Sequence, residues 1–250
     1  MIQRPNPLPR LCRWRSNLLQ APIFFSMTAV WGSIALLLSL FDRSGRMQHR
    51  VARLWADTCL LCSWSSLRIE GAENLRQYPV AVYASNHTSY MDTPVIFVAL
   101  PFQFRILARK QLWQLPFIGW FLNRSGQMPI NTENPSATRS SLGEAVKVLR
   151  GGMPLFVFPE GRRTLSGDLN PFLSGAAYLA IRAQVPLVPI ALTGVYDLLP
   201  MHTHHFYPSR LTLRAGKPIE THGLSIRQTA ELNDRLRAAI EELLAASPAS

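Results

Sequence analysis

The fold is decided by residues 80–92, Val-Ala-Val-Tyr-Ala-Ser-Asn-His-Thr-Ser-Tyr-Met-Asp. The first five residues are apolar or aromatic and include several β-formers, which predicts a short strand buried on both faces in a sheet covered by helices. From Asn86 the stretch is polar and rich in turn and helix-capping residues. Because open α/β sheets bind ligands at the carboxyl ends of their strands, this polar half is a candidate site.

Within the polar half, His87 and Asp92 are a candidate base and the carboxylate that orients it. On one regular helix they would point about 140° apart, because five residues turn through about 500°. A strand-to-helix junction removes this objection: if Thr88 or Ser89 caps a helix, Asp92 lies in the first turn and can reach back to the imidazole. The alternative is a turn histidine beside an acid that only matches the helix dipole.

A second apolar strand, residues 154–158, ends in a similar change of character. It is followed by Glu160, Gly161, Arg162 and Arg163. A glycine between an acid and two arginines lets the backbone approach a ligand, and guanidinium groups suit a phosphate dianion. Taken alone, the segment is equally well interpreted as a solvated loop.

The remaining patterns predict one α/β domain over residues 51–250, preceded by an N-terminal segment of residues 1–50. Its sheet is expected to be mostly parallel or mixed, with helices on its flanks. The predicted helices are residues 51–65, 90–100, 136–149, 174–184 and 225–246. The predicted strands are residues 67–70, 80–84, 104–108, 154–158, 186–192 and 211–215, with a short strand within 126–131 and a turn at 71–78. Residues 109–122 are predicted either to line an apolar groove or to form a core helix.

The N-terminal segment predicts a membrane association. Residues 16–41 carry no charge, and the dense apolar part, residues 21–40, would be about 30 Å long as a helix, enough to cross a hydrocarbon core. A helix lying partly in one leaflet is the alternative. Residues 1–53 hold eight arginines and one aspartate, a net charge of +7, which suits anionic lipid but leaves the orientation undecided.

The basic charge, the cysteines and the histidines do not indicate nucleic-acid or metal binding. Nucleic-acid binding is not expected, because the positive charge flanks an apolar helix and no recognition motif is present. Cys59 and Cys62 form a C-X-X-C without a second pair, which favours buried thiols. His202, His204 and His205 have no carboxylate or cysteine at ligand spacing, so we expect a surface loop there and neither a metal nor a cofactor.

Together, three ordered motifs over roughly residues 50–220 resemble the 1-acylglycerol-3-phosphate O-acyltransferase family of the glycerolipid acyltransferase superfamily. The first is Asn86-His87-X4-Asp92. The second is residues 158–163, Phe-Pro-Glu-Gly-Arg-Arg, where the family has Phe-Pro-Glu-Gly-Thr-Arg. The third is residues 185–189, Val-Pro-Leu-Val-Pro. The resemblance implies the glycerolipid acyltransferase fold.

The resemblance also implies a reaction: transfer of a fatty acyl chain from acyl-CoA or acyl carrier protein to the free hydroxyl of lysophosphatidate, giving phosphatidate. An alcohol needs a base to attack at neutral pH, and His87 is expected to be that base, with Asp92 fixing its tautomer. Direct attack without an acyl-enzyme is expected, with oxyanion donors at the helix start after His87. The residues expected to bind substrate are Glu160, Gly161, Arg163, Arg162, Asn86 and Lys110.

Three positions depart from the family pattern and leave the acceptor open. Pro129 and Thr132 replace an aromatic residue and an arginine, and Leu173 replaces a lysine. Another lyso-lipid, such as a lysophospholipid or lyso-ornithine lipid, is therefore an alternative acceptor, and a non-catalytic lipid-binding protein is the alternative of a different class. Since acyl donors are cytosolic, we expect an inner or plasma membrane location with the catalytic domain facing the cytoplasm.

Overall fold

A seven-stranded sheet forms the centre of the computed structural model, which describes residues 14–42, 44–201, 203 and 205–246. Its strand order is β1-β7-β6-β2-β5-β3-β4. Every neighbouring pair is parallel except β6 and β7. The strands are β1 Ser66–Glu70, β2 Val82–Ser85, β3 Arg105–Arg109, β4 Met128–Ile130, β5 Leu155–Val157, β6 Leu187–Thr193 and β7 Arg210–Ala215. The predicted mixed, mostly parallel α/β sheet is confirmed.

The helices follow the predicted order with shifted ends. They are η1 Ser16–Gln20, α2 Ala21–Leu38, α3 Arg46–Ser63, α4 Ala72–Arg76, α5 Asp92–Ala99, η2 Lys110–Gln114, α6 Ile118–Arg124, α7 Pro135–Arg150, α8 Gly175–Ala183, α9 Val195–Leu198, η3 Ile226–Gln228 and α10 Thr229–Ala245. The predicted turn at residues 71–78 was wrong, because it contains α4. Helix α3 begins five residues before its predicted start, so residue 50 lies within it. Its first turns bury the polar Gln48 and His49, which a hydrophobic pattern does not reveal.

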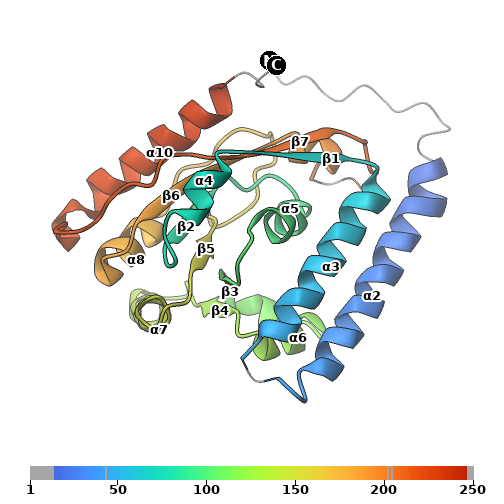
Figure 1. Ribbon diagram of the computed structural model, residues 1–250, viewed down its shortest axis with the longest axis horizontal. Helices are drawn as coiled ribbons and strands as arrows, with labels where there is room; N and C mark the ends of the chain where they lie inside the picture. Colours follow the sequence, from blue (N-terminus) through green and yellow to red (C-terminus); the bar gives the residue numbers. More distant parts are fainter. Residues whose placement is uncertain (1–13, 43, 202, 204, 247–250) are drawn as a thin grey trace.

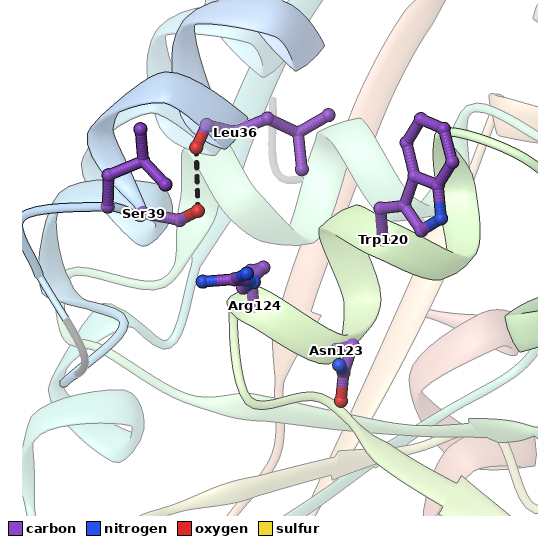
Figure 2. A pocket seen from close by; sticks show the side chains of 6 residues that line it. Leu36, Ser39, Trp120, Asn123 and Arg124 are labelled. Carbon is purple, nitrogen blue, oxygen red and sulfur yellow. Dashed lines mark hydrogen bonds between the residues drawn. The ribbon is translucent and has the colours of Figure 1, made fainter.

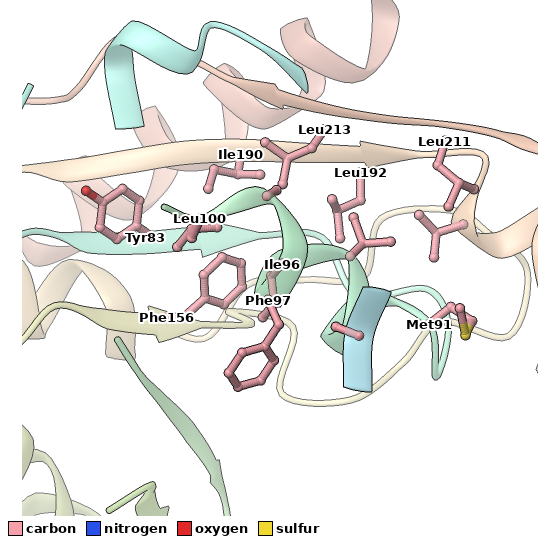
Figure 3. Close-up of a cluster of buried hydrophobic side chains, with 14 of the residues drawn as sticks. Tyr83, Met91, Ile96, Phe97, Leu100, Phe156, Ile190, Leu192, Leu211 and Leu213 are labelled. Atoms are coloured by element: carbon pink, nitrogen blue, oxygen red, sulfur yellow. The ribbon is translucent and has the colours of Figure 1, made fainter. Parts of the chain in front are cut away.

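Helices cover both faces of the sheet (Figure 1). Helices α3 and α5 lie on one face, whose buried core includes Tyr83, Phe97 and Phe156 (Figure 3). Helices α7, α8 and α10 lie on the other face, over Val82 and Leu155. Each short strand therefore contributes alternate side chains to two separate cores, which accounts for its continuous apolar sequence.

The site is positioned by the pairing of β2 with β5. Their parallel register pairs Val82 with Leu155 and Ala84 with Val157. Both strands end within one residue of this pairing. The polar segments that follow them therefore emerge side by side at the same edge of the sheet.

Helix α2 is the outermost layer and packs along α3 (Figure 1). The helical stretch Ser16–Leu38 has 23 residues and a mean hydropathy of 1.8, so it is long and apolar enough to cross a membrane, and only 6% of its apolar window is buried. This is weak support for a membrane association. Four of the eight N-terminal arginines lie outside the described residues: Arg4, Arg10, Arg13 and Arg43.

Candidate active site

His87 and Asp92 are in direct contact at the carboxyl end of β2. Nδ1 of His87 lies 2.7 Å from Oδ2 of Asp92, whose side chain is fully buried. Asp92 is the first residue of α5, and its carboxylate reaches back over the preceding loop. There it also accepts hydrogen bonds from the main-chain N–H groups of Thr88 and Ser89, at 2.6 and 2.9 Å. The predicted strand-to-helix junction thus brings the two side chains together.

The cap of α5 differs from the prediction. Neither Thr88 nor Ser89 is the capping residue: Met91 holds that position and makes no side-chain cap. The Ser89 hydroxyl accepts instead from the Met91 N–H at 3.2 Å. The Asp92 carboxylate itself accepts the hydrogen bonds of the loop N–H groups. A negative charge in the first turn of a helix is also favoured by the helix dipole.

The His87 ring is held flat in a nearly closed environment. It stacks on Phe158 with ring centroids 3.8 Å apart and planes 16° apart, and its side chain is 11% exposed. Burial lowers the pKa of His87 below its ordinary value, Asp92 opposes this, and the positive charge of Arg163 lowers it further. The imidazole is therefore neutral at pH 7. With its Nδ1–H donated to Asp92, its Nε2 is left as the basic nitrogen.

Glu160 joins the two strand-end segments. Glu160 is 5% exposed, and one of its carboxylate oxygens accepts from the main-chain N–H of His87 at 2.7 Å. The other accepts from the main-chain N–H of Asn170 at 2.9 Å. Burial raises the pKa of Glu160, and these hydrogen bonds oppose that rise. Within the described part of the chain Glu160 has no ion pair with Arg163, so its observed contacts are with backbone.

Arg163 lies beside the His87–Asp92 pair. Its Nε donates to the Ser89 carbonyl at 3.2 Å, and its guanidinium carbon lies 4.2 Å from the centre of the Tyr90 ring. Burial lowers the pKa of Arg163, while the nearby charge of Asp92 raises it. A cation is therefore positioned next to the candidate base.

The other predicted site residues have different surroundings. Asn86 is buried and exchanges two hydrogen bonds with the main chain of Leu192, at 3.0 and 2.8 Å, which ties the end of β2 to β6. Gly161 has a φ of +65°, where a side chain is disfavoured. Arg162 and Lys110 are exposed. The substrate-binding roles of these four residues stay predictions.

Arg109 was missed by the sequence analysis. Its Nε donates to the carbonyl of Gly161 at 2.9 Å, from the carboxyl end of β3, the strand next to β5. The signal was present, since a cation at the end of a predicted strand belongs to the edge where ligands bind. Arg109 thereby contacts the loop that follows β5, which carries Arg163.

The main-chain N–H groups of residues 87–89, just ahead of α5, already have hydrogen-bond partners. The main-chain N–H of His87 donates to Glu160, and those of Thr88 and Ser89 donate to Asp92. These three N–H groups are therefore engaged by carboxylates, and the expectation that N–H groups at the start of the helix after His87 stabilise an oxyanion stays a prediction.

An apolar cavity of about 330 Å³ opens beside the loop of residues 86–91, which we call the His87 loop. Tyr90 and Thr93 line one side of it. The opposite walls come from α2, α3 and α6, and include Trp31, Gly32 and Phe121. The predicted groove is thus confirmed in part: Phe117, Ile118, Phe121 and Leu122 of the predicted segment line this cavity.

A neighbouring hollow lies between the carboxyl end of α2 and α6 (Figure 2). Leu36, Leu40 and Trp120 give it an apolar lining, and Arg124 lines it as well. Thr132, at the position of the missing family arginine, lies in a third hollow together with Arg139.

The thiols and histidines outside this site do not form a metal cluster within the residues that the structure describes. Cys59 and Cys62 are both free, and burial raises the pKa of each thiol, as expected of packed rather than reactive cysteines. His202 and His204 lie outside the described residues.

Comparisons with known proteins identify the family. Residues 66–193 match the family model described as Acyltransferase. A Brassica napus protein named 1-acyl-sn-glycerol-3-phosphate acyltransferase BAT2, chloroplastic, is 32% identical over 163 residues, covering 64% of this chain and 47% of its own length. The chain thus matches about half the length of that relative. A Cocos nucifera protein named 1-acyl-sn-glycerol-3-phosphate acyltransferase is 30% identical over 84% of this chain and 70% of its own length.

A solved structure has the same fold. The crystal structure of the Thermotoga maritima 1-acyl-sn-glycerophosphate (LPA) acyltransferase, PlsC, aligns with a TM-score of 0.77 and 24% identity. The alignment covers 95% of this chain and 100% of that one. By family model, relatives and fold, the chain belongs to the 1-acyl-sn-glycerol-3-phosphate acyltransferase family of glycerolipid acyltransferases.

Proposed function

We propose that this protein transfers a fatty acyl chain from acyl-CoA or acyl carrier protein to the free hydroxyl of lysophosphatidate, giving phosphatidate. The observation that carries the proposal is the 2.7 Å contact between His87 and Asp92, formed beside Arg163 and next to an apolar cavity. The names of the relatives support the same acceptor. In this proposal His87 acts on the acceptor hydroxyl, Arg163 binds the acceptor phosphate, and the cavity holds the acyl chain.

The proposed chemistry is a direct displacement. Nε2 of His87 takes the proton of the acceptor hydroxyl while its oxygen attacks the thioester carbonyl. The new carbon–oxygen bond forms, the carbon–sulfur bond breaks, and the imidazolium returns its proton to the leaving thiolate. Asp92 stabilises the imidazolium, and a neutral His87 at pH 7 suits the first step. No acyl-enzyme is formed.

The cavity beside Tyr90 is the proposed site for the acyl chain. Its lining is apolar and it lies within the layer formed by α2, α3, α5 and α6. A fatty acyl chain gains free energy by leaving water for such a surface, roughly 0.8 kcal/mol for each buried methylene group. The volume of the cavity then limits the chain length that the enzyme accepts.

The membrane association is proposed to be monotopic. Helix α2 packs along α3, and α3 packs on α5 inside the catalytic domain. Since α3 carries Arg46, Arg50 and Arg53, a spanning α2 would draw these charges into the hydrocarbon or would have to leave its partner. An α2 lying in the interface keeps this packing and gives its exposed apolar side chains to lipid. Because acyl donors are cytosolic, the catalytic domain is proposed to face the cytoplasm.

A second acceptor class is favoured by the surroundings of Leu173. Leu173 stands where the family has a lysine. It is 58% exposed, and its side chain packs over Gly161. One family arginine is also replaced by Thr132. The described cations in or against the loop of residues 158–174 include Arg109, Arg162, Arg163 and Arg237. A lyso-lipid with a phosphodiester or zwitterionic head group is therefore the alternative acceptor.

The test is thiol release by purified protein with acyl-CoA and acyl carrier protein, each against a panel of lyso-acceptors. We expect turnover with lysophosphatidate, and loss of at least about 100-fold in kcat for His87→Ala, as for removal of a general base. The matched control is His222→Ala, which removes an exposed histidine. Retention of more than a few per cent of activity by His87→Ala would refute the catalytic role.

The panel also separates the alternatives. Turnover with another lyso-lipid but not with lysophosphatidate would assign the second acceptor class. No thiol release with any acceptor or donor, combined with tight binding to vesicles, would instead assign a non-catalytic lipid-binding protein.

A further inference from the structure

Tyr90 is exposed although it lies inside the His87 loop. Its side chain is 53% exposed, between the buried residues Ser89 and Met91. One face of its ring carries the Arg163 guanidinium, with the central carbon 4.2 Å from the ring centre. The residue also lines the apolar cavity, so it contacts both the cavity and the cation.

Two contacts fix Arg163 in this place. Its Nε donates to the carbonyl of Ser89, and the Tyr90 ring supports its planar group. A guanidinium has five N–H donors in a fixed fork, so the use of Nε leaves the terminal nitrogens to bind a phosphate in two places at once. Without the Tyr90 ring, the single hydrogen bond from Nε would leave the plane of the Arg163 guanidinium free to rotate.

We propose that Tyr90 is a positioning residue that holds the Arg163 guanidinium beside the His87–Asp92 pair, in the orientation that binds the acceptor phosphate. This assignment rests on the proposed acyltransferase function. A cation over an aromatic face is stabilised by the ring's quadrupole, and tyrosine supplies this face without adding a charge that would compete for the phosphate.

The same arrangement affects the base. The charged groups around the His87 imidazole are Asp92, in contact with Nδ1, Arg163, and Glu160, which binds the His87 main chain. Arg163 lowers the pKa of His87. If Arg163 loses its support and moves away, the pKa of His87 should rise.

The experiment compares Tyr90→Leu, which removes the ring and stays apolar, with Tyr90→Phe, which keeps the ring. We expect Tyr90→Leu to raise the KM for lysophosphatidate about tenfold, the factor that a cation–π contact of ordinary strength gives, with a smaller effect on the KM for the acyl donor. Tyr90→Phe should keep both constants within about twofold of the wild type. Tyr78→Leu, at a half-buried tyrosine before β2 that does not line the cavity, is the control for loss of a tyrosine.

A double-mutant cycle and a titration test the route through Arg163. In an Arg163→Gln background, Tyr90→Leu should change the KM for lysophosphatidate less than twofold. NMR titration of His87 should show a higher pKa in Tyr90→Leu than in the wild type and in Tyr90→Phe. Equal effects of Tyr90→Leu in both backgrounds, or an unchanged His87 pKa, would overturn the proposal.

The titration needs no substrate, so the two proposals fail separately. If the wild type does not acylate lysophosphatidate, the proposed function fails, while the His87 pKa still reports whether Tyr90 positions Arg163. If Tyr90→Leu changes the KM for the acyl donor instead of the acceptor, Tyr90 is only a wall of the cavity and the positioning role is refuted.

Discussion

The main-chain N–H of His87 donates a 2.7 Å hydrogen bond to Oε1 of Glu160, which lies 73 residues further along the chain. The return contact is a 2.9 Å hydrogen bond from the Thr164 N–H to the His87 carbonyl. The candidate base is thus fixed through its own backbone to the segment after β5. Since Glu160 also binds the Asn170 N–H, one buried carboxylate orders both the base and the loop that carries Arg163.

Glu160→Gln tests this role. An amide offers one acceptor in place of two, so one of the N–H groups now bound loses its partner, at a cost of about 1–3 kcal/mol. We expect a lower melting temperature and a lower kcat, with little change in the KM for the acceptor, because the observed contacts of Glu160 are with backbone. Calorimetry and steady-state kinetics measure both, with the exposed Glu144→Gln as control. A raised KM at unchanged stability would instead indicate a direct contact with the acceptor.

The pH profile of kcat/KM should follow His87. The base must be neutral, and burial holds the pKa of His87 below 6.5. Activity should therefore be level at pH 7 and fall as the pH drops through a value below 6.5, where the imidazole becomes protonated. A limb centred above pH 6.5 would contradict this assignment.

Gly32→Leu should shorten the preferred acyl chain. Gly32 lines the apolar cavity, and an added Cβ meets no atom within 4 Å, so a larger side chain enters the open space. We expect a lower kcat/KM for long acyl donors and an unchanged value for short ones, measured across a series of acyl-CoA lengths. Gly143→Leu is a matched control, because Gly143 also lies in a helix with no atom within 4 Å of an added Cβ and is remote from the cavity lining. Equal loss for all chain lengths would place the acyl chain elsewhere.

His49 should make the fold sensitive to acid. It is 7% exposed, packed against Phe97 and Phe104, and burial, aided by the charge of Arg53, lowers its pKa from 6.5 to about 4. Between these two values the unfolded chain binds more protons, so stability is lost as the pH falls from 6.5 toward 4, by about 2–3 kcal/mol. Denaturant unfolding at pH 7 and pH 4.5 measures the loss.

His49→Leu should reduce that loss, since leucine does not titrate, whereas His222→Leu at an exposed position should not. The same variant separates unfolding from catalysis: if the acid limb of kcat/KM persists in His49→Leu, it belongs to the active site. Identical acid sensitivity of the wild type and His49→Leu would show that other groups control acid unfolding.

Much of the fold was predictable from the sequence, for local reasons. Short apolar runs ending in polar residues predicted both β2 and β5, because burial on two faces leaves a pattern in consecutive residues. The helical spacing of apolar residues predicted the ends of α7, α8 and α10 to within two or three residues. The exception is the start of α10, where the short η3 turn comes first. The start of α3 was predicted late, since its first turns bury polar side chains.

The sequence by itself determined that His87 and Asp92 stand at a strand-to-helix junction and that a second polar segment follows another buried strand. Only the tertiary structure decided that these strands are neighbours, that Glu160 binds the His87 backbone, and that Arg163 lies on Tyr90. The spacing of apolar residues along the chain shows which faces of a strand or helix are buried. The pairing of β2 with β5 and the hydrogen bonds across it depend on which distant segments the packing of the two cores brings together.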